Sequence, residues 1–227
     1  LKGTGATYDY NSDSNPSPFL DNNNIKMVIV SEGVTGIGER LFQYCDNLKT
    51  VSLPTTLTAI KRAAFLPHID GYIYHQTLNG LTELKIPERV TELGVNAFAG
   101  TAIKSVTVPS SVTTVGAMTF SECQYLETVR YSGKIFSDRM FVRCIKLKNL
   151  TLTKSVKEIV GGCFNYCESM KTITYEGSIA DWNAVKKNNN WDGHSNSTVE
   201  TPLTKIQCLD GYMEYNANTK TWKEVKS

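Results

Sequence analysis

The sequence predicts an α/β-type repeat solenoid with short strands, short helices or turns, and a polar cap at each end. First, one phrase of alternating apolar residues recurs at intervals of 23, 33, 22, 23, 21 and 23 residues. Second, six of the eight phenylalanines hold one register within these units. Third, both ends of the chain lose the repeat. Self-similarity with a period of about 20–29 residues is typical of a leucine-rich solenoid, in which each unit buries its apolar face only against its neighbours.

Each unit begins with a short strand, because two apolar residues alternate with polar ones and period two places such pairs on one face of a sheet. The units start at Ile25, Leu48, Leu81, Ile103, Leu126, Leu147 and Met170. The alternating pairs are Val51/Leu53, Leu84/Ile86, Val106/Val108, Val129/Tyr131 and Leu150/Leu152. These residues are expected to line the core.

The rest of each unit predicts a second short strand and then a helical or turn segment. The second strand is marked by two apolar residues three apart, namely Val34/Ile37, Leu57/Ile60, Val90/Leu93, Val112/Val115 and Val156/Ile159. The segment after it holds one phenylalanine in each unit: Phe42, Phe65, Phe98, Phe120, Phe141 and Phe164. We expect these rings to stack as a buried ladder.

Three regions follow from this pattern. Residues 1–24 are rich in Asn, Asp, Ser, Gly and Pro and form the expected N-terminal cap. Residues 25–175 form the solenoid of about seven units, with an insertion at 66–80; the unit at 126 is two residues short, so its second strand is expected to be irregular. Residues 176–227 form the expected C-terminal cap, with a short helix capped by Ser178 and two later strands.

The repeat resembles the BspA-like leucine-rich repeat family of bacterial surface proteins. The phrases that carry the resemblance are "TFSECQYLETV", "CFNYCESMKTI" and "AFAGTAIKSVTVPSSVTTVG". The resemblance covers residues 25–175 and extends to both ends. It implies an extracellular or cell-surface protein that adheres to or recognises host or bacterial surface macromolecules and carries out no chemistry.

Charge and hydropathy exclude some partners. The chain has 24 Lys and Arg against 22 Asp and Glu, without a block of one sign, so we expect no nucleic-acid partner. No apolar run approaches the roughly 18 residues that cross a bilayer, so no transmembrane segment is expected. The first residues, "LKGTGATYDY", lack the features of a signal peptide, so we expect either a cytosolic protein or the mature or trimmed chain of an exported one.

No feature of the sequence predicts an enzyme, a metal site or a cofactor. There are three histidines and no HExxH, GxSxG or P-loop string. Four of the six cysteines, Cys45, Cys123, Cys144 and Cys167, hold one position just after the phenylalanine. This register favours buried free thiols, while disulfides between adjacent units and a metal site remain alternatives.

The insertion is the first candidate for a binding surface, since insertions in repeat proteins often carry recognition. Its sequence after Phe65, "LPHIDGYIYHQTLNG", holds His68, Asp70, Tyr72, Tyr74 and His75. Tyrosine supplies rigid contact area with a polar tip. The alternative is a loop that folds back and covers the solenoid.

Lys85 and Arg130 are the only charged hot-spot candidates on the Thr-rich outer face of the first strands, which is otherwise expected to be solvated. A second class of function, a carbohydrate-binding module or an inert spacer in a larger exported protein, is favoured by Trp182, Trp191 and Trp222 near the C-terminus. The expected partner is therefore a surface protein or a glycan.

Overall fold

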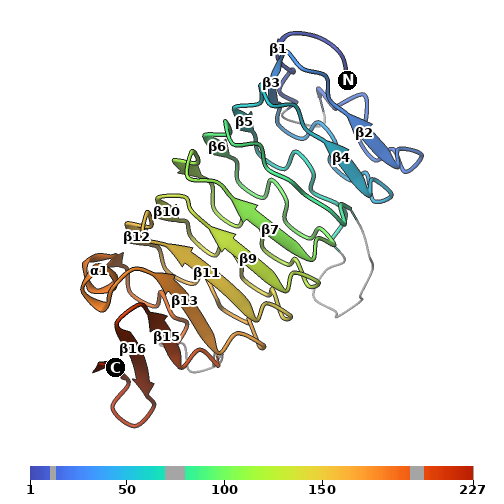
Figure 1. Ribbon diagram of the computed structural model, residues 1–227. Coiled ribbons are helices and arrows are strands. Elements are labelled where there is room, and N and C mark those ends of the chain that lie inside the picture. Colours follow the sequence, from blue (N-terminus) through green and yellow to red (C-terminus); the bar gives the residue numbers. More distant parts are fainter. Residues whose placement is uncertain (11–13, 70–79, 195–201, 227) are drawn as a thin grey trace.

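The chain winds into an elongated stack of similar coils, which we call rungs, in the computed structural model (Figure 1). The structure describes residues 1–10, 14–69, 80–194 and 202–226. The strands step along the stack in chain order, from β2 and β3 near the N-terminus to β15 and β16 near the C-terminus. Most rungs contribute a first strand and a second strand, which pair in different sheets, and a turn segment that holds a phenylalanine.

The first sheet is parallel until it reaches a closing hairpin. Its order is β17-β16-β15-β13-β11-β9-β7, and β16 is antiparallel to both of its neighbours, β15 and β17. The strands are β7 (Ser105–Val108), β9 (Thr128–Tyr131), β11 (Asn149–Thr153), β13 (Thr172–Glu176), β15 (Lys205–Cys208), β16 (Gly211–Asn216) and β17 (Thr221–Lys226). Val106 pairs with Val129, and Leu150 pairs with both Val129 and Ile173. All four side chains are buried, as their alternation predicts.

A separate two-stranded sheet, β2 (Met27–Ile29) with β4 (Thr50–Ser52), lies at the N-terminal end. The strand expected around Leu84 and Ile86 does not form, since residues 81–91 contain no strand. Ile86 is nevertheless buried and Leu84 partly buried, so the apolar alternation is used for packing alone. This rung carries the insertion, and the ladder of first strands is interrupted there.

The second strands form two groups with a break at the short unit. One group has the order β1-β3-β5-β6-β8 and the other the order β10-β12-β14. They are β1 (Gly5–Ala6), β3 (Val34–Ile37), β5 (Ala59–Ile60), β6 (Glu92–Leu93), β8 (Thr114–Val115), β10 (Ile135–Phe136), β12 (Glu158–Ile159) and β14 (Lys186–Lys187). The break between β8 and β10 confirms that the unit at 126 is irregular. Tyr131 and Phe136 are fully buried and meet edge-to-face at 4.5 Å, so two large rings fill this shortened rung.

The helical part of the predicted α/β class is supported only loosely, because the fold is a β-solenoid with little helix. In the described part of the chain the one α-helix is α1 (Ile179–Ala184). The turn segments are not helical because some of their amides bond to the next rung, and amides between them bond to carbonyls three residues back instead of four. Phe98 N donates to Thr119 O at 3.0 Å, and Phe120 N donates to Met140 O at 3.1 Å. The residue two positions before each ladder phenylalanine has a positive φ of 50–70°, which no α-helix allows: Arg40, Ala63, Asn96, Met118, Arg139 and Gly162.

The ring ladder has six members, as the sequence pattern predicted, but it begins one rung earlier, at Phe19, and does not include Phe164. Rings stack in the order Phe19, Phe42, Phe65, Phe98, Phe120 and Phe141, with centroids 5.3–5.5 Å apart and interplanar angles of 5–23°. Phe136 then packs against both Phe141 and Phe164 at 37° and 46°. The ladder thus ends in tilted contacts next to the short rung, where Phe164 was expected to continue the stack.

The cysteines form a second column beside the rings. All six are buried and free. Four thiols donate to the carbonyl of the phenylalanine in the preceding rung at 2.9–3.2 Å, namely Cys45 to Phe19, Cys123 to Phe98, Cys144 to Phe120 and Cys167 to Phe141. The repeat register therefore places a small polar donor where each rung presents a buried carbonyl.

The C-terminal region closes the stack. Ser178 caps α1 in a capping box, since its Oγ accepts from Asp181 N and its N donates to Asp181 Oδ2. The helix buries Ile179 and Trp182. The two expected strands are β16 and β17. None of the helices in the described ranges is long and apolar enough to cross a bilayer.

Truncation of Phe120 tests the ladder. Phe120→Ala is expected to lower the free energy of unfolding by about 3–5 kcal/mol, because it leaves a cavity between two stacked rings. Phe19→Ala is the control, since Phe19 is only partly buried at the end of the ladder and should cost clearly less. Chemical denaturation measures both, and a loss below about 1 kcal/mol for Phe120→Ala contradicts the ladder.

Thiol reactivity tests the cysteine column. Burial raises the pKa of Cys144, and it raises the pKa of Cys167 to about 12. We therefore expect slow labelling of these thiols in the folded protein near pH 8, where the reactive thiolate is scarce. After denaturation without reductant, a thiol-reactive dye should count six thiols. A count of four or fewer reveals a disulfide and contradicts the packing of free thiols.

Candidate recognition surface

Each turn segment presents a residue two positions after its phenylalanine. In most rungs this residue has a positive φ of 59–70°, as at Tyr44, Gly100, Glu122, Arg143 and Tyr166. Its amide donates to the next rung, for example Tyr44 N to Leu66 O at 2.7 Å and Glu122 N to Val142 O at 2.8 Å. We call this row of residues the turn row. Backbone bonds fix four of its members, Tyr44, Gly100, Glu122 and Arg143, to the next rung, which holds this part of the row rigidly.

Pro67 takes the turn-row position in the rung of Phe65 and ends the pattern there. Proline fixes φ near −65° and has no N–H, so it can neither adopt a positive φ nor donate to the next rung. The regular rung therefore stops at Pro67, which is the second residue of the insertion. This gives a local physical reason for the place at which the insertion begins.

Asp46 holds both ends of the insertion. Its Oδ1 accepts from His68 N at 2.8 Å, and its backbone oxygen accepts from Gly80 N at 2.9 Å. The His68 ring also lies 3.1 Å from Asp46 Oδ2 and stacks on Tyr44 with centroids 4.2 Å apart. His68, a predicted site residue, is thus an exposed aromatic residue that belongs to a fixed cluster of Tyr44, Asp46 and His68, which we call the insertion base.

The other predicted residues fall in three situations. Asp70, Tyr72, Tyr74 and His75 lie outside the described residues. Lys85 is exposed, in the segment that forms no strand. Arg130 is on β9, and its guanidinium makes two bonds of 2.6 and 2.8 Å to the carboxylate of Glu176 on β13. Arg130 is therefore engaged across the first sheet, in an exposed pair of the kind that contributes about 0–1 kcal/mol.

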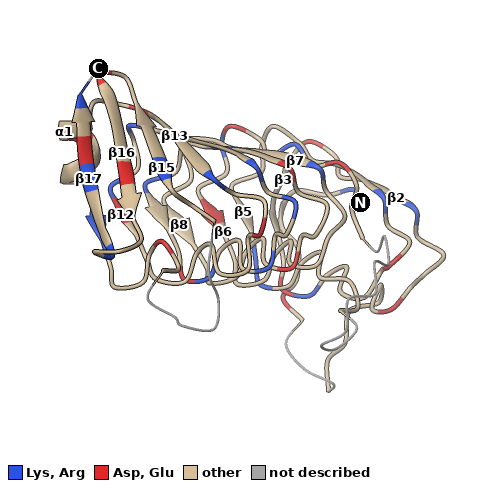
Figure 2. Cartoon of the chain, turned by 90° about the horizontal axis from the view of Figure 1, so that it is seen from below, with Lys and Arg blue, Asp and Glu red and all other residues tan. Residues whose placement is uncertain are grey.

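The turn side carries mixed charge and aromatic rings. Arg143 lies 3.3 Å from Glu122 Oε1, and its guanidinium lies over the Tyr166 ring at 5.1 Å. Lys146 lies over Tyr125 at 4.5 Å. Figure 2 shows basic and acidic residues interspersed along the strands and turns. This pattern suits contact with a mixed polar surface better than contact with a polyanion.

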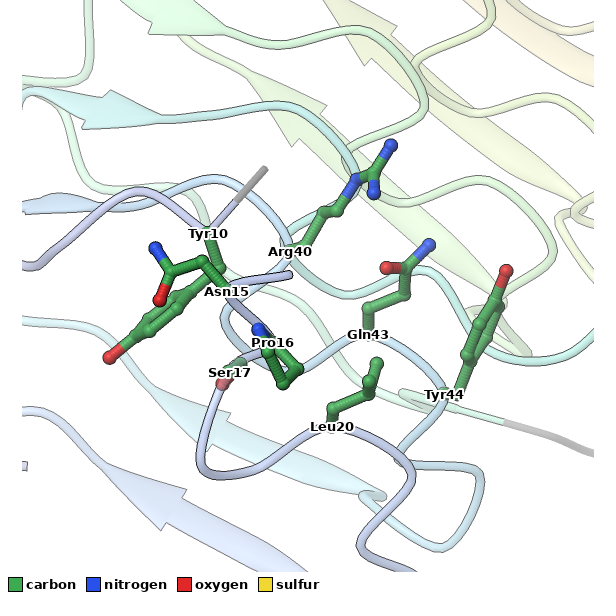
Figure 3. A pocket seen from close by; sticks show the side chains of 8 residues that line it. All are labelled: Tyr10, Asn15, Pro16, Ser17, Leu20, Arg40, Gln43 and Tyr44. Atoms are coloured by element: carbon green, nitrogen blue, oxygen red, sulfur yellow. The ribbon is translucent and has the colours of Figure 1, made fainter. Parts of the chain in front are cut away.

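Sequence reasoning missed a small pocket at the N-terminal end of the turn side (Figure 3). It has a volume of about 140 Å³ and is lined by Tyr10, Asn15, Pro16, Ser17, Leu20, Arg40, Gln43 and Tyr44. Tyr44 also belongs to the insertion base, so the two features are continuous. The missed signal was the position of Phe19, which precedes Phe42 by one repeat period of 23 residues.

The three tryptophans do not form an exposed platform. Trp182 and Trp191 are buried, with ring centroids 5.5 Å apart, and are part of the core of the C-terminal cap. Trp222 is partly buried, and its indole N–H donates to Asp192 Oδ2 at 2.8 Å. The observation that favoured sugar binding is therefore explained by packing.

Two kinds of chemistry find little support. In the described part of the chain no group of three or more His, Cys, Asp and Glu is placed to hold a metal ion. The cysteines are buried, and burial raises the pKa of Cys163 and Cys208. A thiolate nucleophile needs the opposite shift and access to solvent.

Removal of the Asp46 carboxylate tests the insertion base. In Asp46→Ala the His68 amide loses its acceptor, whereas the Gly80 amide keeps the backbone oxygen of residue 46. We expect amide hydrogen exchange to become faster at His68 by about tenfold or more and to stay nearly unchanged at Gly80. Equal protection of His68 in the two proteins would contradict the role of the carboxylate.

Comparison with known proteins agrees with this geometry. The chain matches the family described as "BspA type Leucine rich repeat region" in six copies, over residues 12–69 and 67–185. No curated protein matches the chain. A solved leucine-rich repeat protein from Bacteroides ovatus is 16% identical, covers 91% of this chain and 69% of its own, and has a TM-score of 0.53.

Two other solved structures are less similar in shape. A leucine-rich repeat protein from Eubacterium ventriosum is 16% identical over 91% of this chain and 87% of its own, with a TM-score of 0.39. A leucine rich cell surface protein from Faecalibacterium prausnitzii is 23% identical over 72% of this chain and 63% of its own, with a TM-score of 0.30. The repeat match covers more than half of the sequence, and the matched residues include the stacked rungs. The chain therefore belongs to the BspA-type leucine-rich repeat family.

Proposed function

We propose that this protein is a non-catalytic recognition module, exported and displayed on a bacterial surface, that binds a protein of a host or neighbouring cell. The observation that carries this proposal is the insertion base: Tyr44, Asp46 and His68 fix both ends of an insertion rich in tyrosine on a rigid stack of rungs. Family membership supports protein binding as the class of function. Surface display is inferred from the resemblance to bacterial surface proteins.

The insertion suits a contact surface for physical reasons. A rigid scaffold that presents a loop loses little conformational entropy on binding at the points where the loop is anchored. Tyr72 and Tyr74 supply large side chains with few rotatable bonds. We therefore assign the main contact to residues 66–80. The exposed His68 and the half-buried Tyr44 lie at its base, and Lys85 is an exposed polar residue beyond it.

Array binding with matched tyrosine variants tests the proposal. The labelled chain is applied to arrays of extracellular-matrix proteins, bacterial surface proteins and glycans. We expect saturable capture by at least one protein, and Tyr72→Ala with Tyr74→Ala should reduce that capture by about tenfold or more without lowering the melting temperature. The control variant is Tyr125→Ala with Tyr166→Ala, which removes two turn-side tyrosines outside the insertion.

Other outcomes contradict parts of the proposal. Capture by glycans alone favours the carbohydrate-binding alternative. If Tyr72→Ala with Tyr74→Ala leaves the capture unchanged, the contact lies on another face, such as the Thr-rich outer face of β7 to β13. Antibody labelling of intact cells of the source organism tests display, and a signal that appears only after lysis contradicts it.

A further inference from the structure

The pocket at the N-terminal end exists because the cap imitates a rung imperfectly. Phe19 takes the ladder position, and Asp21, two residues later, has the positive φ of 53° that is typical of the turn row. In a regular rung the phenylalanine amide donates directly to the next rung. Here Ser17 intervenes, since its Oγ accepts from Phe19 N at 3.1 Å and donates to Leu41 O at 2.5 Å. The inserted hydroxyl holds the two backbones apart, and the pocket lies beside it.

Arg40 is the polar group of the pocket that most needs a partner. Its Nε is buried and has no hydrogen-bond partner among the residues that the structure describes. The neighbouring acids are already engaged, because Asp9 pairs with Lys61 at 2.5 Å and Glu39 lies 3.9 Å from Arg62. None of the lining residues is acidic. A buried charged donor without a partner is costly, so such a group in a folded protein calls for an explanation.

The surroundings of Arg40 favour one ligand chemistry. Figure 3 shows the guanidinium of Arg40 and the amide of Gln43 extending in the same direction, with Tyr44 beside them. Arginine binds a carboxylate through two parallel N–H groups, and a side-on pair uses Nε. Pro16, Leu20 and the two tyrosine rings supply apolar walls. The volume of about 140 Å³ is far more than the roughly 10–15 Å³ that one water needs, so a carboxylate and the methylenes that carry it can enter.

We propose that this pocket binds a carboxylate side chain, Glu or Asp, of the protein partner, with Arg40 as the charged anchor and Gln43 as a second donor. This inference rests on the proposed function for the identity of the ligand's source. It adds a contact next to the insertion base, because Tyr44 is shared by the two features. A partner that reaches both would present an acidic residue beside the surface that meets the insertion.

The direct test is NMR titration of the full chain with N-acetyl-glutamate amide. We expect saturable shifts of the Arg40 Nε–H and of the Gln43 side-chain amide, with a dissociation constant near about 1 mM. N-acetyl-glutamine amide, which has the same shape without the charge, should bind at least about tenfold more weakly. Arg40→Gln should weaken the binding of the charged probe by a similar factor, and Arg40→Lys should do so to a smaller degree because lysine lacks the planar fork.

Arg139→Gln is the matched control. Arg139 holds the same rung position as Arg40, with φ of 50° against 54°, but does not line the pocket. It should leave the titration unchanged. Melting temperatures of all variants show whether the fold is kept, and if Arg40→Gln does not fold, the comparison of the glutamate and glutamine probes on the unaltered chain still decides the question.

Several results overturn the inference. The proposed carboxylate site is refuted if the glutamate probe gives no saturable shifts up to about 50 mM, or if Arg40→Gln binds this probe as tightly as the unaltered chain does. Equal shifts with sulfate indicate a general anion site, and glucuronate binding about tenfold more tightly than the glutamate probe indicates an acidic sugar instead of a protein side chain. The two proposals fail separately. Capture of a protein that Arg40→Gln leaves intact refutes the pocket alone, whereas probe binding without any captured protein refutes the proposed function alone.

Discussion

The structure depends on one constraint, which is that a single rung cannot bury its own apolar face. Each ring from Phe42 to Phe120 in the ladder stacks between its neighbours, and the backbone amide of that phenylalanine donates to the next rung. The cysteine thiol of the same segment donates backwards to the preceding phenylalanine carbonyl. Each rung is therefore stabilised by bonds in both directions, and order in the stack is a property of the array as a whole.

The ends and the breaks of the array are the places where this constraint is relaxed, and the candidate sites lie there. At the N-terminal end the Ser17 hydroxyl separates the cap from the first rung and leaves a pocket in which Arg40 Nε has no partner in the described part of the chain. In the rung of Phe65, Pro67 cannot make the bond of the turn row, and Asp46 then fixes both ends of the insertion. The regular part of the stack serves these features as a rigid frame.

The core could be predicted from the sequence because a ring that stacks on the next rung must recur once in each rung, so the phenylalanines keep one register. The unequal spacings also marked the insertion and the irregular unit. Three features could not be predicted from local patterns. Residues such as Arg40 and Tyr44 adopt positive φ because the next rung accepts their amides, which single-unit propensity does not report. Leu84 and Ile86 alternate like a strand, yet their segment forms none beside the insertion. The pocket arises from contact between the cap and the first rung, which are joined only in three dimensions.

The central claim is that backbone bonds between rungs, in addition to the turn bonds within each rung, hold the turn segments. Native-state hydrogen exchange tests it most directly at the amides of Phe65, Phe98, Phe120 and Phe141, each of which donates to the following rung at 3.0–3.1 Å. The account predicts that all four exchange only through large-scale unfolding, with similar free energies of opening that decrease together in mild denaturant. Exchange of these amides by independent local opening, close to the rate of an unprotected amide, would contradict it.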